Sequence, residues 1–160
     1  MRKRMTKAIT AALTAALLFP ALASAVWPVA SGSSYISRYY SSYHKAVDIA
    51  APRWTRVVPM KSGRTVFAGW RNNCGGYQVW VGHGDGLYSA YYHLARETSW
   101  GGELVTGGSE TIGYVGTTGC ATGSHVHVEV WRGYPWRSGS YRVNPWNWID
   151  SGVYLPSRYR

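Results

Sequence analysis

The most regular alternation of polar and apolar positions in the chain lies in residues 123–130, whose sequence is GSHVHVEV. Side chains two positions apart on a β-strand point to the same face. The pattern therefore predicts a strand with His125, His127 and Glu129 on one face and three valines on the other. Valines that face a core give a rigid support to two neighbouring imidazoles, which suits a metal or acid–base chemistry. A half-buried strand with two surface histidines is the simpler alternative.

Further short runs of β-forming residues follow along the chain, separated by turns rich in glycine and asparagine. They are residues 56–59, 65–70, 77–82, 87–94, 111–115 and 125–131. The runs at 77–82 and 87–94 flank the turn sequence HGDG and predict a β-hairpin. With 19 glycines and no convincing amphipathic helix after residue 25, the sequence predicts an all-β fold, an antiparallel sheet with a barrel-like core.

The first 25 residues have the organisation of a secretory signal peptide. Four basic residues open the chain, a mainly Ala/Leu run extends to Pro20, and Ala23-Ser24-Ala25 provides a small-residue cleavage site. The apolar run is short for a membrane span, so we expect cleavage rather than retention as an N-terminal anchor. We therefore assign residues 1–25 to a signal peptide and expect a secreted or cell-envelope protein, either extracellular or periplasmic.

Removal of this signal takes away four basic residues and no acidic one, so the formal charge drops from +10 to +6. The 135 residues that remain of 160 are enough for one domain with a real core. A basic exported protein favours anionic partners, such as cell-wall polymers and lipid head groups. The basic residues are scattered, so we expect no nucleic acid as a partner. We also expect a monomer without stable insertion into a membrane.

The two cysteines, Cys74 and Cys120, lie in a chain that we expect to be exported. In an oxidising compartment a disulfide is the default, and two cysteines allow only one pairing. Metal binding by the pair is the weaker alternative, because neither cysteine lies in a Cys-x-x-Cys arrangement.

The regions outside the strands divide the chain further. Residues 26–43 are rich in Ser and Tyr and are predicted to form an irregular lead-in, and residues 150–160 a flexible tail. The aromatic, proline-rich segment 134–148 is expected to pack over the sheet edge, with a stacking surface for sugars or peptides as the alternative.

Three other histidines complete the set of candidate groups. His44 and Asp48 share a face whether the backbone is helical or extended, which would place a nitrogen and a carboxylate together. A hydrogen-bonded pair without a metal would also explain this spacing. His93 lies in the second strand of the predicted hairpin, whereas His83 lies at its turn, where a solvated or structural role is expected.

The order of these residues is similar to that of a known family. Together with the segments DIAAP at 48–52, GTTG at 116–119 and VNP at 143–145, they make the chain resemble the lysostaphin/LytM-type zinc metallopeptidases of family M23, which cut peptide cross-bridges of bacterial cell walls. The resemblance runs from about His44 to Trp148, and we assign residues 44–149 to such a domain. It implies an antiparallel β core with long loops that form a groove.

The resemblance also implies roles for individual residues. His44, Asp48 and His127 match the ligands of the zinc cofactor, Zn2+. His93 and His125 match the two active-site histidines that are not ligands, so they are the expected catalytic residues. Glu129 matches the acidic residue that ends the motif, where it is expected to support a ligand.

The chain departs from the usual pattern at four positions. It has Ala46 between the first histidine and the aspartate, Ser124 and Val126 around the first histidine of the pair, and Trp54 after the Ala-Pro segment. None of these changes removes a ligand or an active-site histidine. They affect the expected shape of the groove, and hence the substrate, more than the chemistry.

These observations predict a secreted zinc-dependent endopeptidase that hydrolyses peptide bonds in peptidoglycan stem peptides or cross-bridges. The HExxH motif and its glutamate base are absent, so His93 and His125 are the groups available for proton transfer, with their roles undivided. Two alternatives remain at this level. One is a non-catalytic module that binds the wall or regulates other hydrolases, and the other is a different zinc hydrolase, an amidase or carboxypeptidase.

Overall fold

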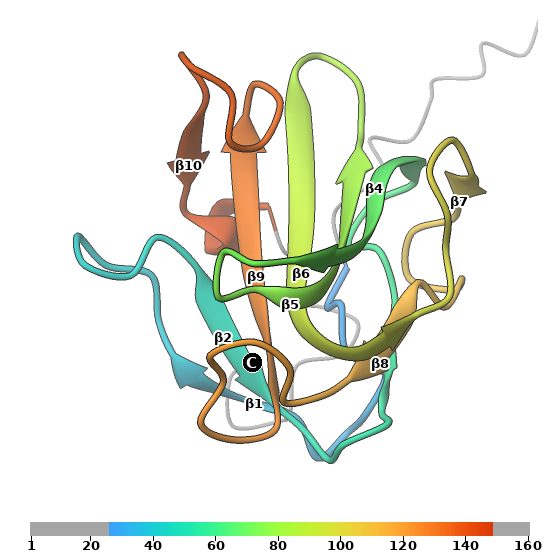
Figure 1. The fold of residues 1–160 in the computed structure, drawn as a ribbon, viewed down its shortest axis with the longest axis vertical. Helices are drawn as coiled ribbons and strands as arrows, with labels where there is room; N and C mark the ends of the chain where they lie inside the picture. Colours follow the sequence, from blue (N-terminus) through green and yellow to red (C-terminus); the bar gives the residue numbers. More distant parts are fainter. Residues whose placement is uncertain (1–25, 149–160) are drawn as a thin grey trace, which may run out of the picture.

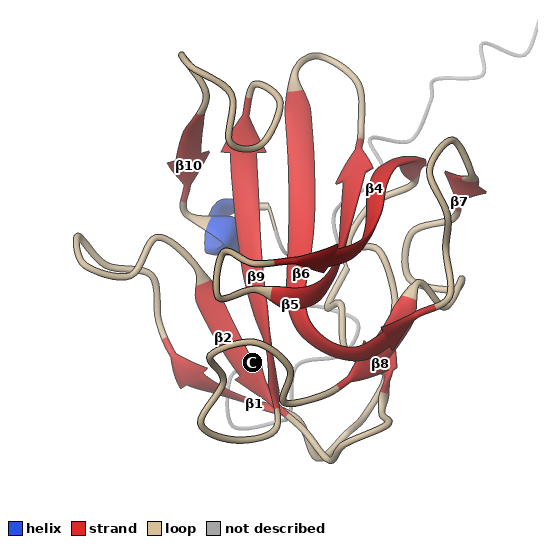
Figure 2. Cartoon of the chain, in the orientation of Figure 1, coloured by secondary structure: helices blue, strands red, loops and turns tan. Residues whose placement is uncertain are grey.

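A computed structural model describes residues 26–148 of the chain. The predicted signal peptide and the predicted tail lie outside the described residues. Within 26–148, ten strands join in one antiparallel sheet, and the only helix is a single 3-10 turn, η1 (Pro145–Asn147) (Figure 2). This confirms the all-β prediction. The described part contains no helix of the length and apolarity that crossing a bilayer requires.

The ten strands pair in one branched sheet. The strands are β1 (Tyr35–Arg38), β2 (Val47–Ala50), β3 (Arg56–Val57), β4 (Gly63–Arg71), β5 (Gly76–Gly82), β6 (Leu87–Glu97), β7 (Leu104–Val105), β8 (Gly113–Val115), β9 (His125–Arg132) and β10 (Tyr141–Val143). They follow the order β1-β2-β9-β6-β5-β4-β7, with β10 paired to β9 and β8 joined to both β3 and β6. In Figure 1, β2, β9 and β6 lie side by side at the centre.

The alternation in residues 123–130 does form the predicted strand, β9. Val126, Val128 and Val130 are buried in the main core, where they pack with residues such as Ile49 and Leu94. Burial of a valine side chain contributes about 1.5 kcal/mol, so this face fixes the register of β9. The opposite face of the sheet carries a second, smaller core that includes Trp80, Tyr92 and Trp131.

The structure corrects the prediction of an irregular lead-in. Residues 35–38 form β1, an edge strand that pairs with β2, and Trp27 and Val29 are fully buried in the main core. No pattern of residues indicated β7 or β10 in advance. The closing aromatic segment does pack on the sheet, since Trp146 and Trp148 lie against the main core, although Trp136 is half exposed.

Candidate metal centre and active site

The pairing of β2 with β9 brings an aspartate and a histidine together from distant parts of the chain. Asp48 faces His127 in the antiparallel register, and Asp48 Oδ1 lies 2.7 Å from His127 Nδ1. His44 lies in the loop that precedes β2. Two hydrogen bonds with Ser41 close this loop: Ser41 N donates to His44 O, and His44 N donates to Ser41 Oγ. This loop holds His44 Nε2 3.2 Å from Asp48 Oδ1. Asp48 lies in β2, whereas residues 44–46 belong to neither a helix nor a strand, so the loop brings His44 to the face of Asp48.

The residues His44, Asp48 and His127 fit a metal ion. One potential ligand atom from each lies within 4.8 Å of the others. His44 Nε2 is buried and is assigned no hydrogen-bond partner among the described residues, although it lies 3.2 Å from Asp48 Oδ1. An unsatisfied buried nitrogen is costly unless something binds it. Two imidazoles and one carboxylate are a donor set that zinc accepts, with a fourth position left open.

The electrostatics of this cluster also favour a cation. Burial alone would raise the pKa of Asp48, but the hydrogen bond and charge of His127 outweigh it and lower that pKa. Burial alone would lower the pKa of His127, but its hydrogen bonds to Asp48 and Glu129 raise it to about 9. Burial lowers the pKa of His44. Without a metal the site therefore holds a proton between His127 and Asp48, which a divalent cation would displace.

His93 is held beside this cluster by two backbone carbonyl groups. Its own backbone N–H donates to Gly75 O at 2.8 Å, and its Nδ1 lies 2.8 Å from Thr118 O. Its φ of 62° is in the left-handed region, which a residue with a side chain adopts only when its surroundings enforce it. Burial is the main cause that lowers the pKa of His93 to about 4, so its imidazole is neutral at neutral pH.

His125 is the second histidine beside the cluster. Its ring centroid is 4.9 Å from that of His93, and its Nδ1 lies 2.9 Å from Gly123 O. A carbonyl oxygen can only accept, so in both histidines Nδ1 carries the proton. In the neutral form this leaves Nε2, on the other side of each ring, free to accept a proton.

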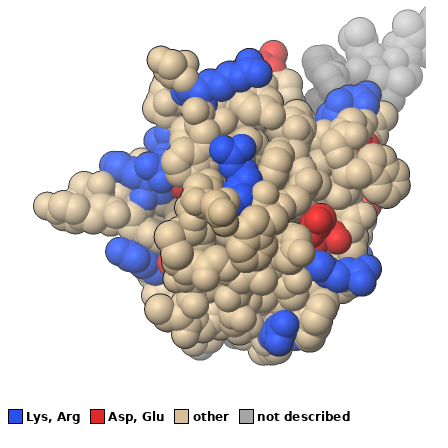
Figure 3. Space-filling model, in the orientation of Figure 1, with Lys and Arg blue, Asp and Glu red and all other residues tan. Residues whose placement is uncertain are grey.

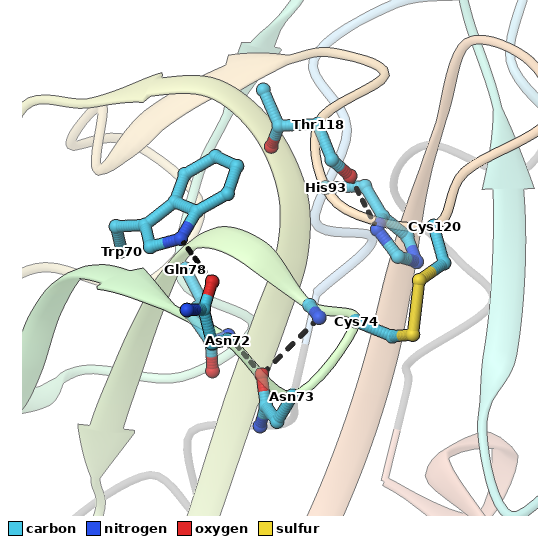
Figure 4. The surroundings of a disulfide bond; sticks show 9 residues. Trp70, Asn72, Asn73, Cys74, Gln78, His93, Thr118 and Cys120 are labelled. Carbon is cyan, nitrogen blue, oxygen red and sulfur yellow. Dashed lines mark hydrogen bonds between the residues drawn. A yellow bond between two sulfur atoms is a disulfide. The ribbon is translucent and has the colours of Figure 1, made fainter.

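A disulfide between Cys74 and Cys120 joins the two segments that hold His93. It connects the turn between β4 and β5 to the loop that precedes β9, as Figure 4 shows, and so confirms the pairing predicted from the sequence. The two backbones approach closely, with Cys120 N donating to Cys74 O at 2.8 Å. A Cβ atom at Gly119 would lie 2.1 Å from Cys74 O, so only glycine permits this approach.

Glu129 lies behind His127 in a set of contacts that the sequence did not reveal. Its carboxylate is 2% exposed and accepts hydrogen bonds from Tyr92 Oη at 2.6 Å, Trp131 Nε1 at 2.8 Å and Arg142 at 2.8 Å. Its Oε1 is also 3.4 Å from His127 Nε2. The alternation of the sequence correctly places Glu129 on the histidine face. Its contact with Arg142 could not be predicted, because Arg142 lies in β10, a strand that the sequence did not indicate.

The remaining histidine, His83, lies apart from this site. Its Nδ1 contacts Ser62 O at 3.0 Å and its Nε2 contacts Ser89 Oγ at 2.8 Å. This agrees with the structural role expected from its position at the hairpin turn. The five side chains that the sequence singled out for chemistry are thus brought together at one place, and His83 is not among them.

The fold and this side-chain cluster define an all-β protein with a candidate site for a single metal ion and two adjacent histidines. Residues 42–145 match the model of Peptidase family M23, so the chain belongs to this family, as the resemblance in its sequence implied.

Individual relatives agree with this assignment. The DD-carboxypeptidase/endopeptidase Mpg of Neisseria meningitidis is 36% identical over 102 residues, which are 64% of this chain and 22% of that protein. Lysostaphin of Staphylococcus simulans is 36% identical over 87 residues, 54% of this chain and 17% of that protein. A solved structure of lysostaphin from Staphylococcus simulans matches with a TM-score of 0.63 at 28% identity, covering 77% of this chain and 53% of that chain. The matched region is thus about a fifth of the length of these curated relatives.

Proposed function

We propose that this protein is a secreted, zinc-dependent endopeptidase that hydrolyses peptide bonds in the stem peptides or cross-bridges of bacterial peptidoglycan. One observation carries the proposal: two imidazoles and a carboxylate converge within 4.8 Å, with the rings of His93 and His125 beside them. Membership of family M23 and the relatives named for endopeptidase activity support the same chemistry. Zinc bound by His44, Asp48 and His127 would polarise the scissile carbonyl and lower the pKa of water from about 16 towards 7.

The two other histidines divide the proton chemistry according to their surroundings. The pKa of His93 is lowered to about 4, so protonating this ring is unfavourable, and we assign it the task of orienting the attacking water. The imidazole of His125 is held by Gly123 O at Nδ1, which leaves its Nε2 available. We assign to His125 the removal of a proton from the water and its delivery to the leaving amine.

The disulfide supports export. A bond between Cys74 and Cys120 persists in an oxidising compartment such as the periplasm or the extracellular space. The predicted signal peptide at residues 1–25 leads to the same conclusion from the sequence. The excess of basic residues would then favour the anionic wall polymer as the partner.

Digestion of purified peptidoglycan with and without a chelator tests this function. We expect soluble products from the zinc-loaded protein, none after chelation, and recovery when zinc is added back. Mass spectrometry of the products should show cut peptides with the glycan–peptide link intact. Products that lack this link would instead identify an amidase, and an unchanged polymer would favour the non-catalytic wall-binding module.

A carboxypeptidase is the second candidate function. The printed name of the Neisseria relative includes both DD-carboxypeptidase and endopeptidase, and the same five side chains would serve either reaction. The two differ in where the scissile bond lies along the peptide. Release of a single terminal amino acid from an uncross-linked stem peptide would favour the carboxypeptidase, whereas separation of cross-linked dimers requires an endopeptidase.

A further inference from the structure

Arg38 stands out among the basic residues near the candidate active site. It ends β1, is exposed, and lies opposite Asp48 of β2 in the sheet register, just beyond an irregularity in the pairing. Among residues 26–148 its guanidinium makes no hydrogen bond or ion pair. Arg142, at the other side of the site, is by contrast bound to Glu129 at 2.8 Å.

Arg38 lines two adjoining hollows. One, of about 260 Å3, contains the three candidate ligands together with His93 and His125. The other, of about 430 Å3, continues away from the ligands along β1, and we call it the β1 hollow. Arg38, Asp48, Thr122 and His125 line both, so the two hollows adjoin at these residues and together form a groove. A peptide that extends from the candidate metal site into the β1 hollow would therefore lie beside Arg38.

The charge of Arg38 is not balanced within this groove. Asp48 is the only carboxylate among the described residues that line either hollow, and its Oδ1 is already occupied by His127 and His44. The β1 hollow thus offers one cation without a partner among residues 26–148.

One face of the molecule carries more basic than acidic groups (Figure 3). On the face shown in Figure 3, basic groups lie above and below the lobe that projects at the left, and they outnumber the acidic groups. Lys45 lines a further hollow that contains no carboxylate among its described residues, together with Arg142, which is already paired with Glu129. This surface favours an anionic substrate over a neutral one.

We propose that Arg38 is a substrate-binding residue that pairs with a free carboxylate of the bound peptide in the β1 hollow, so that the protein prefers acidic stem peptides to uncharged peptides. The planar guanidinium binds a carboxylate through two parallel N–H···O bonds. This inference rests on the proposed function, since it names the class of peptide that the same site takes. It also predicts how the peptide is oriented in the groove, with its carboxylate on the β1 side of the scissile bond.

A pair of peptides that differ only in charge tests the inference. One is a stem peptide with free carboxylates, and the other is the same peptide with each carboxylate converted to a carboxamide. We expect the zinc-loaded protein to have a higher kcat/KM for the acid peptide, and Arg38→Gln to lower the acid-to-amide ratio about tenfold or more. Arg38→Lys should retain part of the preference, because it keeps the charge but loses the planar fork.

Arg96→Gln is the matched control. Arg96 is exposed on β6 and lines neither hollow, so its loss changes the net charge equally and should leave the acid-to-amide ratio at the wild-type value. An equal fall in both variants would attribute the preference to long-range charge and overturn the inference. So would equal cleavage of the two peptides by the wild-type protein, although the proposed function would then stand.

Calorimetric binding of the same two peptides separates this inference from the proposed function. Stronger binding of the acid peptide that Arg38→Gln abolishes would support the role of Arg38 even if neither peptide were cut. Absence of binding to both peptides would overturn it. Thermal unfolding of each variant shows whether the chain still folds, and Arg38→Lys provides the comparison if Arg38→Gln does not.

Discussion

Glu129 Oε1 lies 3.4 Å from His127 Nε2, on the side of the imidazole ring opposite Asp48. A carboxylate that accepts from Nε2–H holds the proton on that nitrogen and leaves Nδ1 free to bind a metal ion. Glu129 is itself fixed by three hydrogen bonds on a buried part of the second core. Glu129 therefore orients His127 in the candidate metal centre, and it lies on the face of β9 that the alternating sequence pattern predicted to be polar.

The first prediction concerns this support. Glu129→Gln removes the charge that stabilises Nε2–H of His127, so we expect about a tenfold loss of zinc affinity. The affinity can be measured by competition with a chromophoric chelator, which needs no catalytic activity. Glu97→Gln, at the end of β6, removes a carboxylate that makes no ion pair among the described residues and should leave the affinity unchanged. An equal affinity in both variants would contradict the supporting role.

The second prediction separates ligands from catalytic residues. Asp48→Ala and His127→Ala should lose both bound zinc and hydrolysis, since each removes one of only three protein ligands. His125→Ala should retain zinc and lose most hydrolysis, about 100-fold or more for a group that transfers protons. Measuring zinc content by atomic emission and kcat for each variant distinguishes a loss of metal from a loss of catalysis. Full zinc occupancy in the Asp48 variant would refute the ligand assignment.

The fold was predictable from sequence where burial imposes a clear pattern. β9 has apolar residues at every second position, and its valines all face the main core. β1 has the sequence YISR and only Ile36 is buried, so no alternation identifies this edge strand. β7 spans two residues, and β10 has three residues with none fully buried. Such short strands exist because a neighbouring strand offers hydrogen bonds, which a local pattern does not record.

The candidate site was predictable in its members but not in its supports. The alternation around His127 places its ligand atom on one face, and the spacing of His44 and Asp48 was compatible with a shared face. His44 nevertheless lies in the loop before β2, where its contacts with Ser41 set its position. The contacts of His93 with Gly75 O and Thr118 O depend instead on how two turns approach each other. Both acceptors are backbone carbonyl groups, which every residue has, so the residue types do not predict these contacts.

The third prediction concerns the disulfide. Cys74→Ser combined with Cys120→Ser should destabilise the protein by about 2–4 kcal/mol, because the bond closes a long loop in the unfolded chain. It should also lower kcat, since Gly75 and Thr118, whose carbonyl groups hold His93, lie on the two segments that the bond joins. Urea unfolding and steady-state kinetics test the two effects separately. A stable variant with unchanged kcat would show that the segments hold His93 without the covalent link.

The fourth prediction concerns the pH dependence of stability and uses His83, which lies outside the candidate site. Burial lowers the pKa of His83 below its ordinary value of 6.5, and its Nδ1–H already donates to Ser62 O. Below pH 6.5 the unfolded chain therefore takes up a proton at this residue more readily than the folded chain does. The free energy of unfolding should be at its full value above pH 6.5 and decline as the pH falls through the lowered pKa.

His83→Gln isolates this contribution, because glutamine keeps a hydrogen-bonding side chain that does not titrate. We expect the variant to be less stable than the wild-type protein at pH 7.5, because it loses the fitted contacts with Ser62 and Ser89. The difference between the two proteins should narrow at pH 5, where only the wild-type chain pays for keeping His83 unprotonated. Urea unfolding at several pH values gives both curves. Parallel curves would mean that His83 titrates alike in the folded and unfolded chains, and its burial would then have no effect on stability in acid.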